Sequence, residues 1–566
     1  MLPYTAPQNE MLLSLLEVAG GRALLNDEFD EDTVKALLSE ASKLAEDELA
    51  PDLSKSDKFP PTLSNGRVRV GKDMHHAHRQ VSQNGWLAMP FNEEVGGLDL
   101  PWSVASLMLE LADSSNVSFA LSMCMTQGCA EAILTHGTSK QIEDYVPYLL
   151  SGKYMGTMQL TEASAGSDVG ALKSIANPNN DGSWSIWGTK IYISWGDSDV
   201  SANIIHLVLA RTPEGTPGTK GLSLFLVPSV LPDGTRNNII TAGLEEKLGI
   251  HGSPTCTLIH EGSQGWLIGP EFGGMAAMFT MMNNARIGVG FQGAGVSERA
   301  LQAAREFAKG RVQGGKEIIQ HMDVRRNLLI MKALTCASRD LGYSAHVAGD
   351  LSRLGGPESA KYKRRIDILT PIAKAFMTDA AIEVTNLGIQ IHGGMGVIEE
   401  AGAAQLARDC RVFTIYEGTN GIQALDLIGR KTMRDKGQSM KELIQDMRET
   451  LISAEKLELT DITIPFDEAV TDIEATLNQL INEDINEDLM AARASAFLQM
   501  ISYVLGAWGM LKRRIVTTES ANRDIAEEQK HLSQFYMTQI LPRYRLGLAA
   551  LYNGASVLAR HPQDLI

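Results

Sequence analysis

A single carboxylate follows an apolar run in the stretch Val412-Phe413-Thr414-Ile415-Tyr416-Glu417-Gly418-Thr419-Asn420-Gly421-Ile422-Gln423. A carboxyl group in an apolar setting loses hydration, which raises its proton affinity toward that of a useful general base. The glycine after it allows a ligand to approach the backbone closely, and residues 420–430 have the pattern of a helix. A plainer interpretation also stands, in which Glu417 lies beside a helix N-terminus because the helix dipole favours a negative charge there.

Two further segments lie just upstream. They are Ile389-Gln390-Ile391-His392-Gly393-Gly394-Met395-Gly396 and Ala407-Arg408-Asp409-Cys410-Arg411. Together with the first stretch they resemble the C-terminal signature of the acyl-CoA dehydrogenase family. The resemblance implies that Glu417 removes a proton from the carbon next to a thioester carbonyl, while FAD takes hydride from the next carbon.

The composition bounds the class of protein. At 566 residues the chain is too long for one ordinary core, so about three or four domains are expected. Hydrophobic residues make up 44% and charged residues 21%, values typical of a soluble globular protein. The net charge of −17 argues against a nucleic-acid partner, which would need a basic surface. The negative net charge does not argue against CoA as a ligand, because a few local Arg and Lys side chains can bind its phosphates.

The cysteines indicate the compartment. They are Cys124, Cys129, Cys256, Cys336 and Cys410. Because they are scattered and lack metal-ligand spacing, we expect no metal site and a reducing compartment, the cytoplasm. Cys124 and Cys129 fit either a redox pair or buried helix positions, and the general tendency of cysteine to be buried favours the second.

Neither a signal peptide nor a membrane span is expected. Residues 1–7 lack a charged n-region and a cleavage pattern. The 18 residues Ala494–Leu511 carry no charge, which is the lower limit of length for a span. They include Ser, Gln and Gly, which dilute the hydrophobicity and favour a buried bundle helix over a membrane or partner contact.

The first part of the chain, residues 1–155, has the pattern of a helical domain. Apolar residues recur at three- and four-residue spacing in Glu10–Val18 and in Asp32–Glu48, and helices are expected again over Val104–Leu150. Loops rich in Gly, Pro, Ser and Asp are predicted at Pro51–Val70 and Gly85–Pro101.

Between residues 156 and 272 the period changes to that of strands. The β-rich runs are Tyr154–Leu160, Trp184–Ser194, Ile204–Ala210, Leu222–Val227 and Thr255–His260. Turn signals separate them, which predicts a small antiparallel β-domain.

Long helical patterns return after Gly273-Gly274. They cover Met275–Ala308, Gln320–Asp350, Lys361–Gly388, 400–408 and 420–430, and predict a helical bundle over 273–430. A linker is predicted around 431–445, followed by an extra helical domain over 446–566. The fold class is therefore α+β and mostly α. This order of domains resembles that of the acyl-CoA dehydrogenase family, and the extra domain resembles the larger bacterial members of the 3-methylmercaptopropionyl-CoA dehydrogenase type.

The stretch Leu160–Asp168 resembles the flavin loop of that family. Hydroxyl groups at Thr161 and Ser167 can hydrogen-bond a flavin ring or its phosphates. Members often have proline where this chain has Ala163. Taken alone, the segment also fits an ordinary strand-to-turn connection.

The family usually places Trp-x-Thr against the flavin where this chain has Lys190-Ile191-Tyr192-Ile193-Ser194. Tyr192 keeps an aromatic face and Ser194 keeps a hydroxyl. Trp195 is the alternative aromatic contact or a core residue, and the register favours Tyr192.

The resemblance assigns further FAD contacts to the C-terminal bundle. Arg311 with Gln313 falls where family members bring an arginine from a neighbouring subunit to the flavin pyrophosphate, which suits the paired donors of a guanidinium. A homo-oligomer, at least a dimer, is therefore implied. The remaining assigned contacts are Gln390, Gly393 and Gly394 for the ADP half, and Thr419 and Asn420. A solvated Arg311 in a Gly-rich loop is the plainer alternative.

Substrate contacts are assigned to Arg286, Tyr416 and Gly418. Arg286 is the candidate for CoA. Some relatives carry their catalytic glutamate immediately before this arginine, and this chain has Ala285 there, which leaves Glu417 as the base. In relatives the amide at the glutamate binds the thioester oxygen, and such a donor stabilises the charge that develops there.

The function implied is an FAD-dependent acyl-CoA dehydrogenase of fatty acid β-oxidation that passes its electrons to an electron-transferring flavoprotein. Two alternatives share the fold: an acyl-CoA oxidase, which differs only in oxygen access, and a catalytically silent acyl-CoA-binding protein. The length and chemistry of the acyl group are not readable, because pocket depth depends on helix packing.

Overall fold

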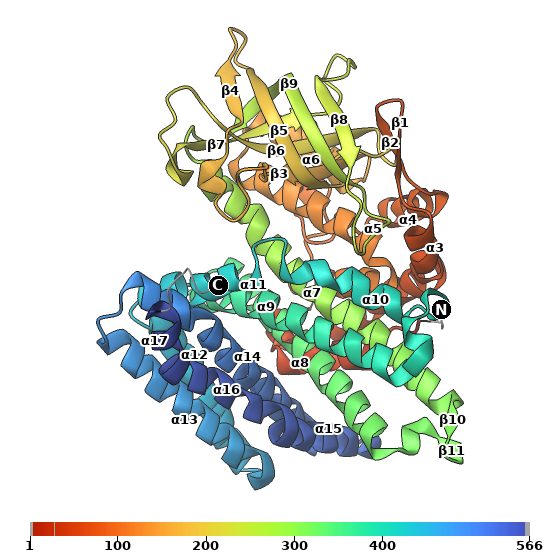
Figure 1. Ribbon diagram of the computed structural model, residues 1–566, viewed down its shortest axis with the longest axis vertical. Helices are drawn as coiled ribbons and strands as arrows, with labels where there is room; N and C mark the ends of the chain where they lie inside the picture. Colours follow the sequence, from red (N-terminus) through yellow and green to blue (C-terminus); the bar gives the residue numbers. More distant parts are fainter. Residues whose placement is uncertain (1–3, 28, 561–566) are drawn as a thin grey trace.

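The computed structural model describes residues 4–27 and 29–560. A small sheet lies at one end of a large helical body, and helices precede and follow it in the chain (Figure 1). The mostly helical fold class with a β region in the middle is confirmed.

Short helices at the start of the chain pack around one long helix, α5. The elements of this region are α1 Gln8–Leu12, η1 Leu13–Val18, η2 Gly21–Leu24, α2 Glu31–Lys43, η3 Leu44–Leu49, η4 Ala50–Asp52, α3 Leu53–Lys58, β1 Thr62–Ser64, β2 Arg67–Arg69, α4 Lys72–Gln83, η5 Glu93–Val95, α5 Trp102–His136 and α6 Ser139–Leu150. The loop expected at 51–70 is wrong, because α3 and the β1–β2 hairpin form there. Its buried side chains, such as Leu53 and Val68, are too widely spaced to show a period.

Helix α5 is fixed at its start by α8 (Met322–Arg353). The Asp350 carboxylate of α8 accepts hydrogen bonds from the backbone N–H of Trp102 at 3.0 Å and of Ser103 at 2.8 Å. A carboxylate at this position satisfies free helix donors and complements the dipole. Further along, α5 is kinked at Asn116, whose φ of −154° and ψ of 84° are not helical.

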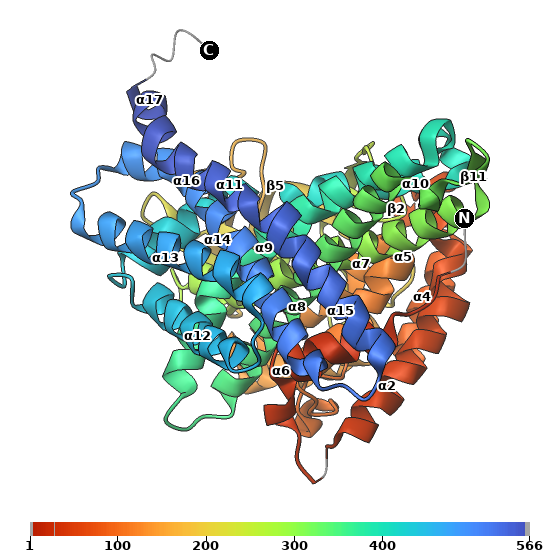
Figure 2. The same cartoon turned by 90° about the horizontal axis from the view of Figure 1, so that it is seen from below.

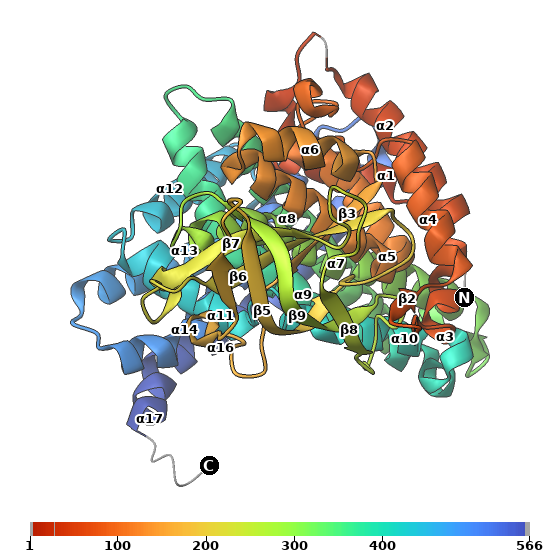
Figure 3. The ribbon, with the colours of Figure 1, turned by 90° about the horizontal axis from the view of Figure 1, so that it is seen from above.

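Seven strands form the middle region. They are β3 Tyr154–Gln159, β4 Ile175–Pro178, β5 Trp184–Ser194, β6 Asn203–Arg211, β7 Leu222–Pro228, β8 Ile239–Leu244 and β9 Thr255–Ile268, with short turns η6 Val169–Ala171 and η7 Thr219–Gly221 between them. The pairings β6–β7–β9–β5–β4–β6 return to the first strand, so the sheet curls into a small barrel to which β3 and β8 are attached. Seen from above, it covers the helices on which β3 and β7 rest, α5 and α7 (Figure 3).

The sheet differs from the expected antiparallel domain in two ways. First, β3 runs parallel to β6, because the chain passes through the β4–β5 hairpin before returning beside β3, and this is long enough for a crossover. Second, β4 and β8 were not expected. Most of their residues are at least partly exposed, so neither strand has a continuous apolar run.

The central bundle is built from long helices. Its elements are α7 Gly274–Gly310, β10 Val312–Gln313, β11 Lys316–Glu317, η8 Ile318–Gln320, α8, α9 Ser359–His392, η9 Gly393–Val397, η10 Glu399–Ala401, α10 Ala403–Cys410, η11 Arg411–Thr414, α11 Asn420–Leu425 and η12 Asp426–Met433. Helix α7 runs from the sheet to the β10–β11 hairpin at the far end of the molecule and packs on α5, α8 and α9 along the way (Figure 1).

A buried guanidinium joins three of these helices. Arg339 of α8 has no exposed surface. Its Nε lies 2.7 Å from Glu110 Oε1 on α5, and its Nη2 lies 2.9 Å from Glu298 Oε2 on α7. Buried charges are tolerated only when they are paired in this way. The network therefore sets how α5, α7 and α8 sit against one another.

The last helices form a layer against the bundle (Figure 2). They are α12 Gln438–Glu455, α13 Thr460–Asn482, α14 Glu487–Thr518, α15 Arg523–Phe535, η13 Tyr536–Ile540, η14 Leu541–Arg543, α16 Tyr544–Ala549, η15 Ala550–Gly554 and α17 Ala555–Arg560. The linker expected at 431–445 is shorter and spans only residues 434–437, because η12 ends at Met433 and α12 starts at Gln438. Residues 438–445 belong to α12, where Met440 and Leu443 are buried.

Arg513 of α14 docks this layer. Its Nε lies 2.6 Å from Asp340 of α8, and its Nη1 lies 2.6 Å from Glu10 of α1. The uncharged stretch Ala494–Leu511 lies within α14, where most of its residues are buried, as predicted. Among the described residues, α5 and α14 are long and apolar enough to cross a membrane by length and composition, but 89% and 78% of their most apolar windows are buried inside the protein.

Candidate active site

Glu417 stands on a tight loop between η11 and α11. The backbone φ is +56° at Glu417 and +86° at Gly418, so two consecutive residues are in the left-handed region. A side chain at position 418 would be strained there, and its Cβ would lie 2.7 Å from Gln423 Nε2. Strained backbone of this kind persists where the surroundings fix it, and it is concentrated at functional sites.

The surroundings do fix the loop. The Gln423 side-chain amide donates to the carbonyls of Glu417 at 3.3 Å and of Gly418 at 3.1 Å. Thr419 caps α11, because its hydroxyl accepts from the backbone N–H of Ile422 at 3.2 Å. The loop is therefore held from its own helix.

Arg286 of α7 holds the loop from the other side. Its Nε donates to the Glu417 carbonyl at 3.3 Å, and its Nη1 lies 3.5 Å from Asp426 of η12. Arg286 is only 5% exposed, and burial lowers the pKa of its guanidinium. The structure thus brings together Arg286, Tyr416, Glu417 and Gly418, four residues that the sequence placed in one site.

A second buried cation, Lys374 of α9, lies behind the loop. Lys374 has no exposed surface, and its Nζ donates to Asn420 Oδ1 at 2.9 Å. The Asn420 amide in turn donates to Asp379 at 2.7 Å and to Thr378 at 3.1 Å. Both polar ends of the Asn420 side chain are thus engaged within the chain.

These charges set the proton affinity of Glu417. The surrounding protein desolvates the carboxyl group and raises its pKa to about 7, while the positive charges of Arg286 and Lys374 act in the opposite direction. Burial lowers the pKa of Lys374 to about 7, and the Glu417 carboxylate opposes that shift. Glu417 is also partly exposed, so a ligand can reach it. A carboxyl group with this pKa changes protonation near neutral pH, as a general base needs.

Tyr416 ties the loop to α7. Its hydroxyl donates to Gln292 Oε1, and its ring stacks on Phe413 with the centroids 6.1 Å apart. Next to it, the backbone N–H of Glu417 has no acceptor among residues 4–27 and 29–560. An unpaired N–H beside the carboxylate is a donor available to an oxyanion.

Most of the residues assigned to the flavin ring lie where β3 and β5 come together. Leu160 and Thr161 leave β3 beside β5, where the Ile191 N–H donates to the Thr161 carbonyl at 3.0 Å. The β5–β9 register shifts between Lys190 and Ile193, and Tyr192 has a φ of +60°. This bulge turns the Tyr192 side chain outward, and Tyr192 is 61% exposed.

Trp195, the alternative aromatic contact, lies elsewhere. It is fully buried, and its indole N–H donates to the Ser118 carbonyl at 3.2 Å. Ser194 accepts through its carbonyl from the Thr157 hydroxyl at 2.7 Å. Ser167 is exposed in the loop that follows Thr161. Which aromatic side chain meets a flavin stays a prediction.

Glu162, inside the same loop, has a structural partner. Its carboxylate lies 2.8 Å from the buried Lys190 Nζ and accepts from the backbone N–H of Lys173 at 2.6 Å and of Ser174 at 3.0 Å. Burial acts to raise the pKa of Glu162, but the Lys190 charge and these hydrogen bonds outweigh it and lower the pKa. Glu162 therefore anchors the loop and is unsuited to accept a proton.

The other predicted cofactor residues lie at the far end of the bundle. Arg311 follows the last residue of α7, about 37 Å along the helix from Arg286 at 1.5 Å per residue. The segment Gln390–Gly394 at the end of α9 lies near it, because the His392 ring packs against Phe307 of α7 with ring centroids 4.5 Å apart. Within one chain, these residues therefore lie far from Thr161, Tyr192 and Glu417.

This far surface has features that suit a dinucleotide. Gly393 and Gly394 are exposed, and a Cβ at either would meet nothing within 4 Å, so a ligand can approach the backbone. Arg311 and Gln313 are exposed, and Arg311 has no side-chain partner among the described residues. Exposed glycine amides and a free guanidinium are groups that bind phosphates.

Three residues of the site, Lys374, Gln423 and Gln292, were not predicted from the sequence. Lys374 lies in the run Ile372-Ala373-Lys374-Ala375-Phe376-Met377, where one charge among apolar residues was a readable signal of a paired, buried cation. Gln423 and Gln292 had no such signal, because their roles depend on contacts between distant helices. Among the described residues, no group of three or more His, Cys, Asp or Glu side chains is arranged to hold a metal.

Known families match this chain along most of its length. Models of the acyl-CoA dehydrogenase N-terminal, middle and C-terminal domains match residues 31–153, 157–262 and 273–433. A model described as acetyl-CoA dehydrogenase C-terminal like matches residues 441–562.

Individual proteins agree with these models. The 3-methylmercaptopropionyl-CoA dehydrogenase of Ruegeria pomeroyi is 40% identical over 434 residues, which cover 74% of each chain. The structure of Caenorhabditis elegans ACDH-11 in complex with C11-CoA has a TM-score of 0.83 at 20% identity and covers 98% of this chain and 96% of that one. A chain in a structure of the electron transferring flavoprotein of Acidaminococcus fermentans has a TM-score of 0.61 at 27% identity and covers 71% of this chain and 98% of that one. The protein described here therefore belongs to the acyl-CoA dehydrogenase family of oxidoreductases.

Proposed function

We propose that this protein is an FAD-dependent acyl-CoA dehydrogenase that converts an acyl-CoA thioester to the trans-2-enoyl-CoA, with Glu417 as its base. The observation that carries the proposal is the environment of Glu417. Its carboxyl has a pKa of about 7, stands on a strained loop, and is influenced by the charges of two buried cations. Perturbed carboxyl groups of this kind are concentrated at catalytic sites.

The chain's own residues can bind and polarise the substrate. A thioester carbonyl placed at the free N–H of Glu417 would receive a hydrogen bond that strengthens as negative charge develops on its oxygen. The same placement brings the α-carbon to the Glu417 carboxylate, which then takes the proton. Arg286 keeps the loop in position through the Glu417 carbonyl.

Two sets of residues would hold FAD. Leu160, Thr161, Ser167, Tyr192 and Ser194 would face its ring, and Arg311, Gln313, Gln390, Gly393 and Gly394 would face its phosphates and ADP half. Thr419 and Asn420 would contribute through their backbone, since their side chains are engaged. When bound, FAD supplies the acceptor for a hydride from the β-carbon.

The distance between the two sets supports assembly. Because Arg311 lies far from Tyr192 and Glu417 within one chain, we propose that Arg311 serves the FAD of a second copy in a homodimer or larger oligomer.

We also propose an electron-transferring flavoprotein as the electron acceptor, supported by the similarity to a chain found in such a structure. The five free, buried cysteines support a reducing compartment such as the cytoplasm.

The base is tested by Glu417→Gln. The amide keeps the shape but cannot accept a proton, so FAD binding and acyl-CoA binding should persist while anaerobic flavin reduction slows by about 10²–10⁴-fold or more. Stopped-flow absorbance of the flavin measures this. Glu131→Gln is the matched control, because burial also raises the pKa of Glu131 to about 7 and its side chain bonds to Asn284 of α7. If Glu417→Gln reduced its flavin at the wild-type rate while Glu131→Gln lost flavin reduction, the base would have been misassigned.

The second prediction concerns Lys374. Lys374→Met removes one of the two positive charges that oppose the effect of desolvation on Glu417. The pKa of Glu417 should therefore rise. The rate of flavin reduction requires the carboxylate, and it therefore increases with pH through that pKa. We expect its midpoint near pH 7 in the wild type and at higher pH in Lys374→Met, with Lys374→Arg close to wild type. An unchanged midpoint with a uniformly lower rate would limit Lys374 to a structural role.

Assembly is tested through Arg311. Arg311→Met should leave folding and self-association intact but weaken FAD binding about ten- to a hundredfold, because charge-assisted bonds to phosphate are lost. FAD titration of the stripped protein and light scattering measure these two properties. Arg326→Met, which removes an exposed arginine paired within its own helix to Asp323, is the control. A fully active, FAD-loaded monomer would contradict the assembly.

A further inference from the structure

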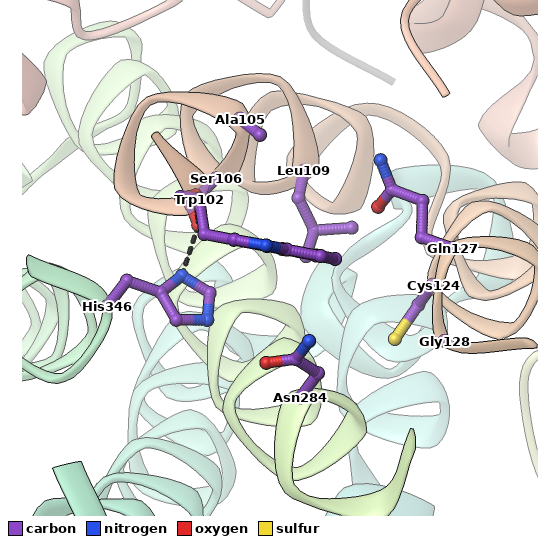
Figure 4. A pocket seen from close by; sticks show the side chains of 9 residues that line it. All are labelled: Trp102, Ala105, Ser106, Leu109, Cys124, Gln127, Gly128, Asn284 and His346. Carbon is purple, nitrogen blue, oxygen red and sulfur yellow. Dashed lines mark hydrogen bonds between the residues drawn. The ribbon is translucent and has the colours of Figure 1, made fainter. Parts of the chain in front are cut away.

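A small cavity lies between α5, α7 and α8, beside the catalytic loop but lined by none of the residues assigned above. It has room for about 20 Å³ and is bordered by Trp102 and Cys124 of α5, Asn284 of α7 and His346 of α8, among others. Figure 4 shows these side chains converging from the three helices, with the His346 ring below the Trp102 indole. A space of this size accepts one water molecule or one small polar group.

The hydrogen bonds around Ser106 favour one tautomer of the His346 ring. The Ser106 hydroxyl donates to the Trp102 carbonyl at 2.7 Å, which uses its single proton. Ser106 Oγ also bonds to His346 Nδ1, and with its proton used it accepts there. We therefore assign the hydrogen to His346 Nδ1, which leaves a lone pair on Nε2.

This lone pair is buried without a partner. His346 is 4% exposed, and Nε2 has no hydrogen-bond partner among the described residues. Burial lowers the pKa of His346 to about 3, so the ring stays neutral and does not satisfy Nε2 by protonation. Burying an acceptor without a partner costs folding free energy, and such groups are rare in native structures. A ligand group that occupied the adjacent cavity would satisfy it.

The ring cannot turn away from the cavity. It is held by Ser106 on one side and packs on Phe291 of α7 on another, with ring centroids 5.5 Å apart. One turn further along α8, Asp350 caps the start of α5. The acceptor is therefore held rigidly, as a recognition group should be.

The cavity is close to the catalytic loop. Asn284, on its wall, is two residues from Arg286, which bonds to the Glu417 carbonyl. Cys124, also on its wall, lies against α7 at Gly288, where a Cβ would be 2.8 Å from the Cys124 Sγ. Burial raises the pKa of the Cys124 thiol, and the charge of Glu417 is near enough to raise it further. Helix α7 therefore borders the cavity through Asn284 and holds the Glu417 loop through Arg286.

We propose that the acyl group runs from Glu417 along α7 to this cavity and that His346 Nε2 recognises a hydrogen-bond donor at its far end, so that the preferred substrates are acyl-CoA thioesters bearing a terminal hydroxyl. This inference rests on the proposed function and names the substrate class of that site. A hydroxyl placed in the cavity supplies the missing donor. An unsubstituted acyl group of the same length leaves the acceptor unpaired, and sites built around a polar group discriminate strongly against analogues that lack it.

The test is a comparison of matched thioesters. Holoenzyme carrying Glu417→Gln, which should bind without turnover, is titrated by calorimetry with ω-hydroxyacyl-CoA thioesters of increasing length, each paired with the unsubstituted acyl-CoA. At one length the hydroxyl should tighten binding about tenfold or more. The added substitution His346→Leu should abolish that preference while leaving the affinity for the unsubstituted partner within a fewfold.

Two further variants guard against a folding artefact. Ser106→Ala removes the group that fixes the His346 tautomer, so the hydroxyl preference should shrink while the imidazole remains. His206→Leu removes another buried neutral histidine, in β6, and should leave the preference intact. Equal affinities for both members of every pair, or a preference that survives His346→Leu, would overturn the inference. Flavin reduction by unsubstituted acyl-CoA in the otherwise wild-type protein would still support the proposed function in that case.

Discussion

The geometry of the candidate active site depends on the buried guanidinium of Arg339, which lies outside the site. Arg339 joins α8 to Glu110 of α5 and to Glu298 of α7. Burial opposes its charge, but the two carboxylates outweigh that effect and raise the pKa of Arg339 well above its ordinary value. Removing one partner of such a network costs about 3–5 kcal/mol, because a charge is left buried and unpaired. The relative placement of α5, α7 and α8 is therefore specified by charge pairing as well as by apolar packing.

The loop that carries Glu417 is held by this fixed frame of helices. Arg286 and Gln292 project from α7 to hold Glu417 and Tyr416, and Lys374 projects from α9 behind them. The frame supplies two opposing influences on Glu417, desolvation and nearby positive charge, and their balance leaves its pKa at about 7. A shift in α7 would alter both influences at once, so the stability of the bundle and the proton affinity of Glu417 are connected.

Sequence reasoning succeeded where the signal is local. Periodicity predicted the order of helical, β and helical regions, and the motif around Glu417 placed it with Arg286. It failed where the structure depends on distant partners. The parallel β3–β6 pairing cannot be read from either strand, and the exposed strands β4 and β8 carry too few apolar residues. Lys374 was passed over because the apolar run around it reads as an ordinary buried helix.

The same distinction explains the cofactor residues. The family resemblance assigned Tyr192 and Arg311 to one flavin site, whereas β5, which carries Tyr192, lies at the opposite end of the molecule from β10, which follows Arg311 (Figure 1). The resemblance at Arg311 implied a neighbouring subunit, and the separation within one chain supports the proposed second copy. The outward turn of Tyr192 likewise arises from a bulge in the pairing of β5 with β9, which is a property of both strands.

The proposed removal of a proton by Glu417 can be tested without any redox step. A CoA thioester that lacks β-hydrogens, such as acetyl-CoA, cannot transfer hydride, so exchange of its α-hydrogens with deuterated water reports only the base. We expect the FAD-loaded wild-type protein to catalyse this exchange, faster as the pH rises through about 7, and Glu417→Gln to reduce it to the uncatalysed rate. Exchange at the wild-type rate in Glu417→Gln would contradict the assignment of Glu417 as the base.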